Sequence, residues 1–243
     1  MIGSDFVSCA GYALSLLRRN AGFWLWFAPL FFMVVNALTL VPFIGYVLRQ
    51  LVFAVLGGQI LVMLSEAAAG RQVRLRTLGG AAELPVSSFV LLAGAALFPF
   101  IAGLVVLAAG DSSHTVVPFF IGNMYMMRPP EVAEFFKLNV VMQVASAPFA
   151  FLGYFICVQR EAASSAWRRA FSLACDKSHI LAVFLVANLG LEYAADFRTG
   201  SSLNDAVCVV VFIAFGLFQI ALAFAIPARS EGAARARVED GMA

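Results

Sequence analysis

Charged residues are scarce in this chain. They make up 12% of its 243 residues, about half the share that is usual in a soluble globular domain. Apolar residues reach 62%, and the mean hydropathy is +0.91. A soluble domain of this length has too small an interior to remove so much apolar surface from water. The composition therefore excludes an ordinary soluble protein and predicts one whose apolar surface is covered by lipid.

The motifs of common enzyme active sites are also missing. The sequence has no HExxH, GxSxG, Walker or CxxC pattern, and it has only two histidines. Those patterns supply the metal ligands, the nucleophiles and the phosphate-binding loops of many enzyme classes. We therefore predict that the protein is not an enzyme and has no catalytic residue, no metal site and no cofactor.

Long apolar runs dominate what remains. A helix needs about 20 apolar residues to cross the hydrocarbon of a bilayer. The first two runs are separated only around Pro42, just before Gly45, and this pair predicts a tight helical hairpin. The predicted fold class is all-α, a polytopic membrane bundle of about six transmembrane helices. Six runs qualify, at residues 23–41, 44–64, 86–109, 138–158, 180–195 and 206–227.

The basic residues predict the orientation of this bundle. Loops on the cytoplasmic side carry an excess of Lys and Arg. With the N-terminus inside, four basic residues face outward, namely Arg49, Arg128, Lys137 and Arg198. The other twelve face the cytoplasm: Arg18, Arg19, Arg71, Arg74, Arg76, Arg160, Arg168, Arg169, Lys177, Arg229, Arg235 and Arg237. We predict a single membrane domain over residues 1–228 of a bacterial inner-membrane protein, with both termini cytoplasmic and a short flexible tail at 229–243.

Two stretches of the sequence resemble each other. Ala13-Leu14-Ser15-Leu16 precedes the first apolar run by the same distance at which Ala170-Phe171-Ser172-Leu173 precedes the fifth. Each belongs to an amphipathic segment followed by a charged break and then by a pair of apolar runs. A third copy is expected around residues 70–84. The pattern predicts three units, each with one interfacial helix and two spanning helices. The alternative is that basic amphipathic helices precede membrane spans without any repeat.

The N-terminal third carries a resemblance to a known family. The run from Tyr12 to Leu48, with its Arg-Arg-Asn break and its Val-Pro-Phe-Ile-Gly turn, is followed by Gly70 and Arg71. It resembles an uncharacterised family of bacterial six-helix inner-membrane proteins, which is similar to the membrane domain joined to some glycerophosphodiester phosphodiesterases. The chain shows no soluble catalytic domain, so the resemblance implies the fold and no phosphodiesterase activity.

Polar residues within the apolar runs are the candidate site. Such groups are costly in hydrocarbon and usually face the protein interior. Asn188 lies one helical turn from Glu192 and shares its face. We expect Arg49 to pair with Glu192 or Asp196, because all three lie toward the outer ends of their helices. The group forms either a polar pocket that binds a lipid headgroup or small solute, or an ion pair that fixes helix packing. Further polar residues at membrane depth are Asn36, Gln59, Gln143 and Gln219.

Two functional hypotheses follow. The preferred one is a non-enzymatic accessory or scaffold protein of the membrane, and the alternative is a transporter or lipid-handling protein with a polar pocket near the outer leaflet. The expected partners are the lipid bilayer and a lipid or membrane protein, with a homo-oligomer also open and no nucleic acid. The outer loop, residues 110–137, is expected to be either a lid over the bundle or a docking surface. A water-filled cavity that reaches the polar residues would favour the transporter or lipid-handling hypothesis. A closed bundle with an exposed apolar groove or a docked chain would favour the accessory or scaffold hypothesis.

Overall fold

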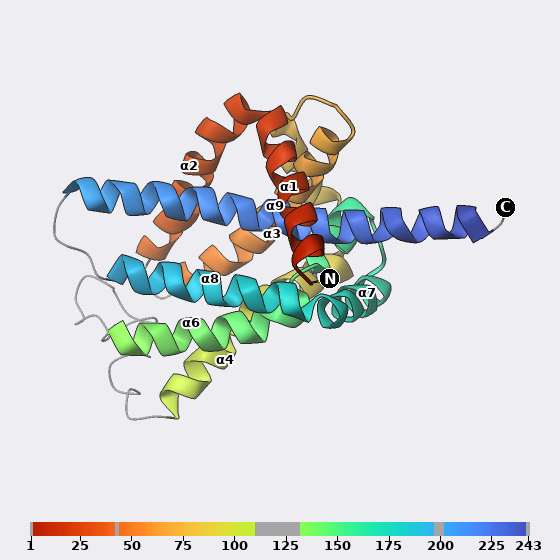
Figure 1. Ribbon diagram of the computed structural model, residues 1–243. Coiled ribbons are helices and arrows are strands. Elements are labelled where there is room, and N and C mark those ends of the chain that lie inside the picture. Colours follow the sequence, from red (N-terminus) through yellow and green to blue (C-terminus); the bar gives the residue numbers. More distant parts are fainter. Residues whose placement is uncertain (1, 42–43, 110–131, 197–201, 242–243) are drawn as a thin grey trace.

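The computed structural model describes residues 2–41, 44–109, 132–196 and 202–241, and these are helical with no β-strand among them (Figure 1). This confirms the predicted all-α fold. Residues 110–131, which form most of the predicted lid, lie outside the described part. The elements are α1 (Ile2–Arg19), α2 (Ala21–Ala37), η1 (Leu38–Leu40), α3 (Gly45–Ala68), η2 (Leu75–Glu83), α4 (Val86–Ala108), α6 (Val132–Ser146), η3 (Ala147–Phe149), η4 (Tyr154–Val158), α7 (Ala163–Asp176), α8 (Ser178–Asp196) and α9 (Ser202–Gly241).

Five helical segments of the described chain are long and apolar enough to cross a membrane. The predicted fifth run forms α8, and it meets the same test only together with α7, to which it is joined at a bend of 79°. The prediction of about six spanning segments is therefore met by five helices and one bent pair. The five segments are Ala21–Leu40, Gly45–Ala68, Val86–Ala108, Lys137–Val158 and Val207–Gly232.

The amphipathic elements α1, η2 and α7 gather at one end of the bundle. Figure 1 shows α1, η2 (gold) and α7 toward the right, whereas α6, α8 and the first half of α9 extend to the left. Alanines of α1 and α7 face inward with no exposed surface, including Ala13, Ala166 and Ala170, while the basic Arg18 and Arg168 are exposed. An apolar inner face that packs on the bundle and a charged outer face are typical of amphipathic helices. We refer to this end of the bundle as the interfacial end.

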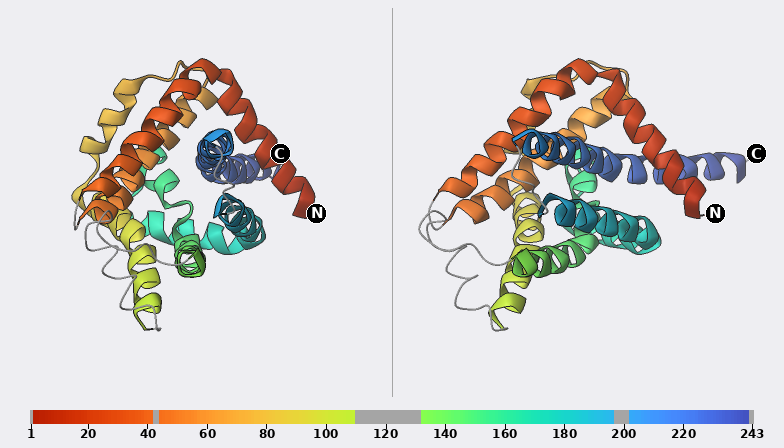
Figure 2. Two further views of the ribbon diagram at one scale, coloured as in Figure 1. Left: turned by 90° about the vertical axis from the view of Figure 1, so that its left-hand side faces the viewer. Right: turned by 60° about the vertical axis from the view of Figure 1, so that its left-hand side comes forward.

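The packing of these elements repeats around the molecule. Each interfacial element lies against the second long helix of the preceding unit: η2 against α3, α7 against η3 and η4 at the end of the fourth apolar run, and α1 against α9. The contact between α1 and α9 joins the first unit to the last and closes the ring. Figure 2 shows the helices from two further directions, arranged around a common centre. The element order and the contacts thus follow the predicted pattern of three units.

The fourth apolar run is not one regular helix. Helix α6 ends at Ser146, a 3₁₀ turn follows over Ala147–Phe149, and a π-helix covers Tyr154–Val158. Pro148 explains the break, because proline has no backbone N–H to donate and its ring crowds the preceding turn. The sequence predicted a kink at this proline and another at Pro99. Helix α4 continues through Pro99 without a break, and the kink there stays a prediction.

Helix α9 differs from its prediction at the C-terminal end. The sequence predicted a span that stops at residue 227 and a separate tail from residue 229. The helix continues through Pro227 and reaches Gly241, a length of 40 residues. At 1.5 Å per residue it is about 60 Å long, twice the thickness of the hydrocarbon. Its last part therefore projects beyond the rest of the bundle (Figure 1).

Close packing between α3 and the end of the fourth run gives a stability prediction. A Cβ atom added at Gly58 would lie 2.5 Å from the Cys157 sulfur, whereas one added at Gly57 would meet no atom within 4 Å. Gly58→Ala should therefore destabilise the protein by about 1–3 kcal/mol, and Gly57→Ala should not. Thermal unfolding in a mild detergent measures both effects.

A second substitution tests the cause. Cys157→Ala removes the sulfur, and the next atom, Cys157 Cβ, lies 3.6 Å from the added methyl group. Adding Cys157→Ala to Gly58→Ala should recover part of the lost stability. Equal unfolding temperatures for Gly57→Ala and Gly58→Ala would show that these helices do not pack as described.

Candidate functional site

The interior of the bundle contains two neighbouring pockets. The first has a volume of about 480 Å³ and lies between α6, α7, α8 and α9. Most of its wall is apolar, with Phe151, Leu185 and Leu222 among the lining residues. Its polar lining includes Gln143 of α6, Asn188 of α8 and Gln219 of α9.

The second pocket has a volume of about 460 Å³ and lies between α3, α4, α6 and α9. Its lining also combines apolar side chains with several polar ones. The polar members are Arg49 and Gln50 near the start of α3, Asn139 in the middle of α6, and Gln143 and Ser146 toward the end of α6. Arg49 is therefore the cationic side chain among the residues that line either pocket.

A shared wall separates the two pockets. Four residues line both of them, namely Gln143, Ser146, Ala150 and Ala223. Three of these belong to α6 or to the broken stretch just after it, and Ala223 comes from α9. The Pro148 break therefore lies in the wall between the pockets. Departures from regular α-helix are often found at functional sites.

One hydrogen bond ties the polar groups of this wall to the next helix. The Asn188 side-chain nitrogen donates to the Gln143 side-chain oxygen at 3.0 Å, and so joins α8 to α6. A carboxamide in hydrocarbon needs such a partner, because an unpaired amide there is costly. Gln143 thus contributes to both pockets and receives a bond from the residue that the sequence had placed in the site.

The structure brings together part of the predicted group. Arg49 lines the second pocket and Asn188 the first, and Gln143 stands between the two pockets. Glu192 and Asp196 belong to α8, but their side chains lie outside the described part, so their pairing with Arg49 stays a prediction. Sequence reasoning singled out neither Gln50 nor Asn139. Both lie near predicted span ends, where a polar residue is ordinary.

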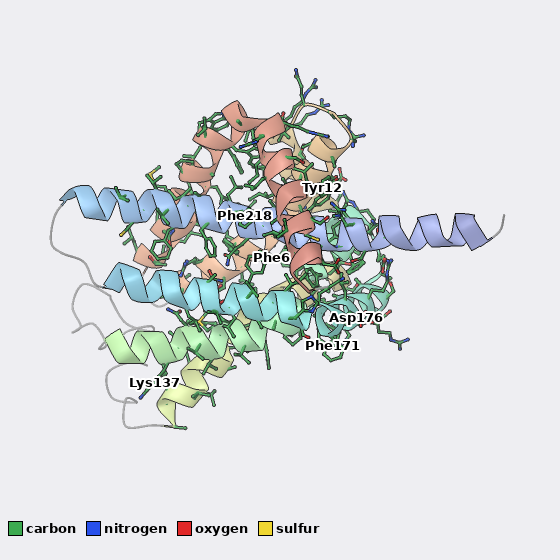
Figure 3. The ribbon with its side chains drawn as sticks, in the orientation of Figure 1. Phe6, Tyr12, Lys137, Phe171, Asp176 and Phe218 are labelled. Carbon is green, nitrogen blue, oxygen red and sulfur yellow. The ribbon has the colours of Figure 1, made fainter. Side chains whose placement is uncertain are left out.

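The first pocket lies where two helices fail to pack. Helices α8 and α9 are the two long helices of the third unit, yet they have little close contact with each other in the described part. The equivalent pair in the second unit, α4 and α6, packs more tightly than any other pair of elements described. Phe6 of α1 reaches α8, where its ring lies 6.0 Å from that of Phe184 (Figure 3). The pocket is thus bounded by α8 and α9 at a place where they stand apart.

A second polar cluster lies at the interfacial end. The Arg169 guanidinium contacts Glu161 and also donates to Glu231 of α9 at 2.7 Å. The same Glu231 accepts a bond of 2.8 Å from the Gln159 side chain and one of 3.2 Å from the Tyr154 hydroxyl. These bonds hold the projecting part of α9 against α7 and η4. No pattern in the sequence indicates this cluster, because Glu231 falls in the stretch that the sequence predicts to be a flexible tail.

The groups in the two pockets are suited to binding. Carboxamides both donate and accept hydrogen bonds, and a guanidinium pairs with carboxylate or phosphate oxygens. Ligand pockets of proteins typically have volumes of about 300–1,000 Å³ and combine an apolar lining with a few polar groups. Both pockets fall in this range. Among the described residues, no group of three His, Cys, Asp or Glu side chains is placed to hold a metal ion.

Comparison with known proteins adds no relative. No protein-family model matches the chain, and no curated protein or solved structure matches it either. The resemblance of the N-terminal third to six-helix inner-membrane proteins therefore stays a prediction. What defines the molecule is its fold and its interior: a helical protein of membrane-length helices with a polar site between them.

The bond between Asn188 and Gln143 yields a prediction. Asn188→Leu should destabilise the protein, because Gln143 loses its donor from α8. Side-chain hydrogen bonds between membrane helices contribute about 0.6 kcal/mol on average and at most about 1.7 kcal/mol. A double-mutant cycle with Gln143→Leu, measured by unfolding in detergent, should give a coupling energy in this range. A coupling energy of zero would mean that the two side chains do not interact.

Proposed function

We propose that this protein is a multi-pass inner-membrane protein that binds an amphiphilic molecule of the membrane, such as a lipid or a lipid precursor. The ligand's polar end contacts Arg49, Gln143 and Asn188, and its apolar part lies in the adjoining pockets. The observation that supports this most is the pair of pockets that share Gln143, with polar groups among a largely apolar lining.

The match between lining and ligand supports an amphiphile over a polar solute. A polar solute would leave most of the lining, which includes Phe53, Leu61 and Leu222, without apolar contact. A wholly apolar ligand would make no hydrogen bond to the polar residues of the lining, which include Gln219 and Asn139 besides the bonded pair Asn188 and Gln143. An amphiphile satisfies both parts. The place where α8 and α9 stand apart offers it a route from the surrounding lipid.

These pockets change the preference between the two hypotheses drawn from the sequence. A water-filled cavity that reaches the polar residues was the feature expected of a transporter or lipid-handling protein, and the cavities lined by Arg49 and Asn188 support that hypothesis. The accessory role expected from the sequence stays a prediction. Lipid handling is the function that the geometry supports better.

We also propose that the interfacial end faces the cytoplasm. Most of the predicted cytoplasmic arginines lie on α1, α7 or the chain between α3 and η2, and these segments share that end (Figure 1). The excess of basic residues in cytoplasmic loops supports this orientation. Both chain termini would then be cytoplasmic.

Filling the shared wall tests the binding site. Ala223→Phe places a ring at the border of both pockets, so it should remove most of the lipid that co-purifies with the protein in mild detergent. Ala214→Phe is the matched control, since Ala214 is an exposed residue of the same helix that lines neither pocket. Native mass spectrometry and lipid extraction measure the bound amount.

Arg49→Met provides a second test of the same site. If Arg49 binds the polar end of the ligand, the variant should fold normally and lose selectivity for anionic lipids by roughly tenfold, the effect of about 1.4 kcal/mol. If Arg49 only fixes helix packing, expression and unfolding temperature should fall instead. Unchanged lipid content in both Ala223→Phe and Arg49→Met would refute the proposed binding site.

Cysteine labelling tests the orientation. Cys175 of α7 is exposed, while Cys9 and Cys157 are buried, and burial raises the pKa of the Cys9 thiol and so reduces its reactive thiolate. In a Cys208→Ser background, a membrane-impermeant maleimide should label Cys175 in inverted inner-membrane vesicles. Labelling of Cys175 from the periplasm of intact cells would show the opposite orientation.

A further inference from the structure

Five arginines converge at one corner of the interfacial end. The side chain of Arg19, at the end of α1, donates to the backbone oxygen of Ala67 at 3.4 Å, which places the end of α1 beside the end of α3. The views in Figures 1 and 2 agree on this, with the loop after α3 next to the end of α1. We call this group the basic corner, and its members are Arg18, Arg19, Arg71, Arg74 and Arg76.

The backbone holds the loop arginines at this corner. Gly70 ends α3 with a φ of +73°, a left-handed conformation that favours glycine. The next amide, of Arg71, donates to the Glu66 oxygen at 2.9 Å, and the chain then returns so that the Thr77 hydroxyl lies 3.1 Å from the Glu66 carboxylate. Val73, between the arginines, is buried in the core. The loop is therefore fixed to the end of α3.

The charge of the corner is not balanced within the described chain. All five arginine side chains are exposed. None of them forms an ion pair with a carboxylate of the described residues, whose ion pairs involve Arg160, Arg169 and Lys177. The Glu66 carboxylate, at the end of α3, accepts a hydrogen bond from the Thr77 hydroxyl. The corner thus presents positive charge outward.

The depth of the corner identifies its ligand. The membrane-length segment of α2 begins at Ala21, two residues after Arg19, and that of α3 ends at Ala68, three residues before Arg71. With these segments in the hydrocarbon, side chains at these positions would lie at its boundary with water, where the lipid phosphates are. Guanidinium groups bind phosphate oxygens with paired hydrogen bonds, and clustered basic residues beside a membrane span attract anionic lipids.

We propose that the basic corner binds the phosphate of an anionic membrane lipid. The site is separate from the interior pockets, none of whose lining residues belongs to the corner. The occupant is a lipid in the bilayer and not a soluble phosphate compound, because the corner lies at the level of the headgroups. The exposed arginines would hold the adjoining ends of α1 and α3 against the leaflet.

The test compares two triple variants with equal loss of charge. The loop variant removes three positive charges of the basic corner and combines Arg71→Gln, Arg74→Gln and Arg76→Gln. The control variant removes three positive charges from α7 and α9 and combines Arg168→Gln, Arg235→Gln and Arg237→Gln. Phosphatidylglycerol, titrated into the detergent-purified full chain, should raise the unfolding temperature of the natural protein and of the second variant. The affinity of the loop variant for this lipid should be weaker by at least roughly tenfold, because three basic residues near an anionic surface are removed.

Three further arms decide between the possible sources of a response. Phosphatidylcholine and inorganic phosphate should have little effect, and the response to phosphatidylglycerol should weaken in high salt. Equal stabilisation by inorganic phosphate would overturn the proposal in favour of a soluble anion. A response that is lost in Ala223→Phe but kept in the loop variant would place the lipid in the interior pockets and also overturn it. If the triple variant does not fold, the double variant Arg74→Gln and Arg76→Gln replaces it, with a loss of binding again required.

Discussion

Hydrocarbon offers no hydrogen bonds, and this one constraint governs where the polar groups of the bundle lie. Several polar side chains of the long helices turn back to their own backbone: the Asn36 amide donates to the Phe32 oxygen at 2.7 Å, and the Ser65 hydroxyl donates to the Val62 oxygen at 2.7 Å. The bond between Asn188 and Gln143 is different because it crosses from one helix to another. This polar contact between two helices lies at the border of the two pockets.

The interfacial elements also shape the architecture of the bundle. Each of them braces the second long helix of the preceding unit, and α1 completes the ring on α9. Three equal units would leave three equal helix pairs, but the pairs differ, with α4 and α6 tightly packed and α8 and α9 apart. The Pro148 break belongs to the neighbouring fourth run and prevents it from filling the gap as a straight helix. The first pocket lies beside the helix pair that stands apart.

Much of the fold was predictable because membrane spans are set by local composition. Apolar runs of the required length located the long helices, and amphipathic segments located α1 and α7. The pairing of Arg169 with Glu231, 62 residues apart, could not be read from the sequence, since it depends on α9 continuing past Pro227. Arg49 and Asn188 were found because polar residues stand out in apolar runs. Gln143 was noted only as one of several amides, since nothing local shows that its position borders two pockets.

The arrangement of charge along α3 bears on how both proposed sites would be used. Arg49 lies near the start of this helix, and Arg71 follows shortly after its end. The 18 residues from Arg49 to Ala67 correspond to about 27 Å, close to the thickness of the hydrocarbon. The same helix therefore carries a cationic group near each membrane surface, with apolar pocket lining between them. Because an ionised group in mid-membrane is costly, the charge of a bound amphiphile would stay near Arg49 while its apolar part extends toward the middle of the bundle. The basic corner would bind lipids of the opposite leaflet.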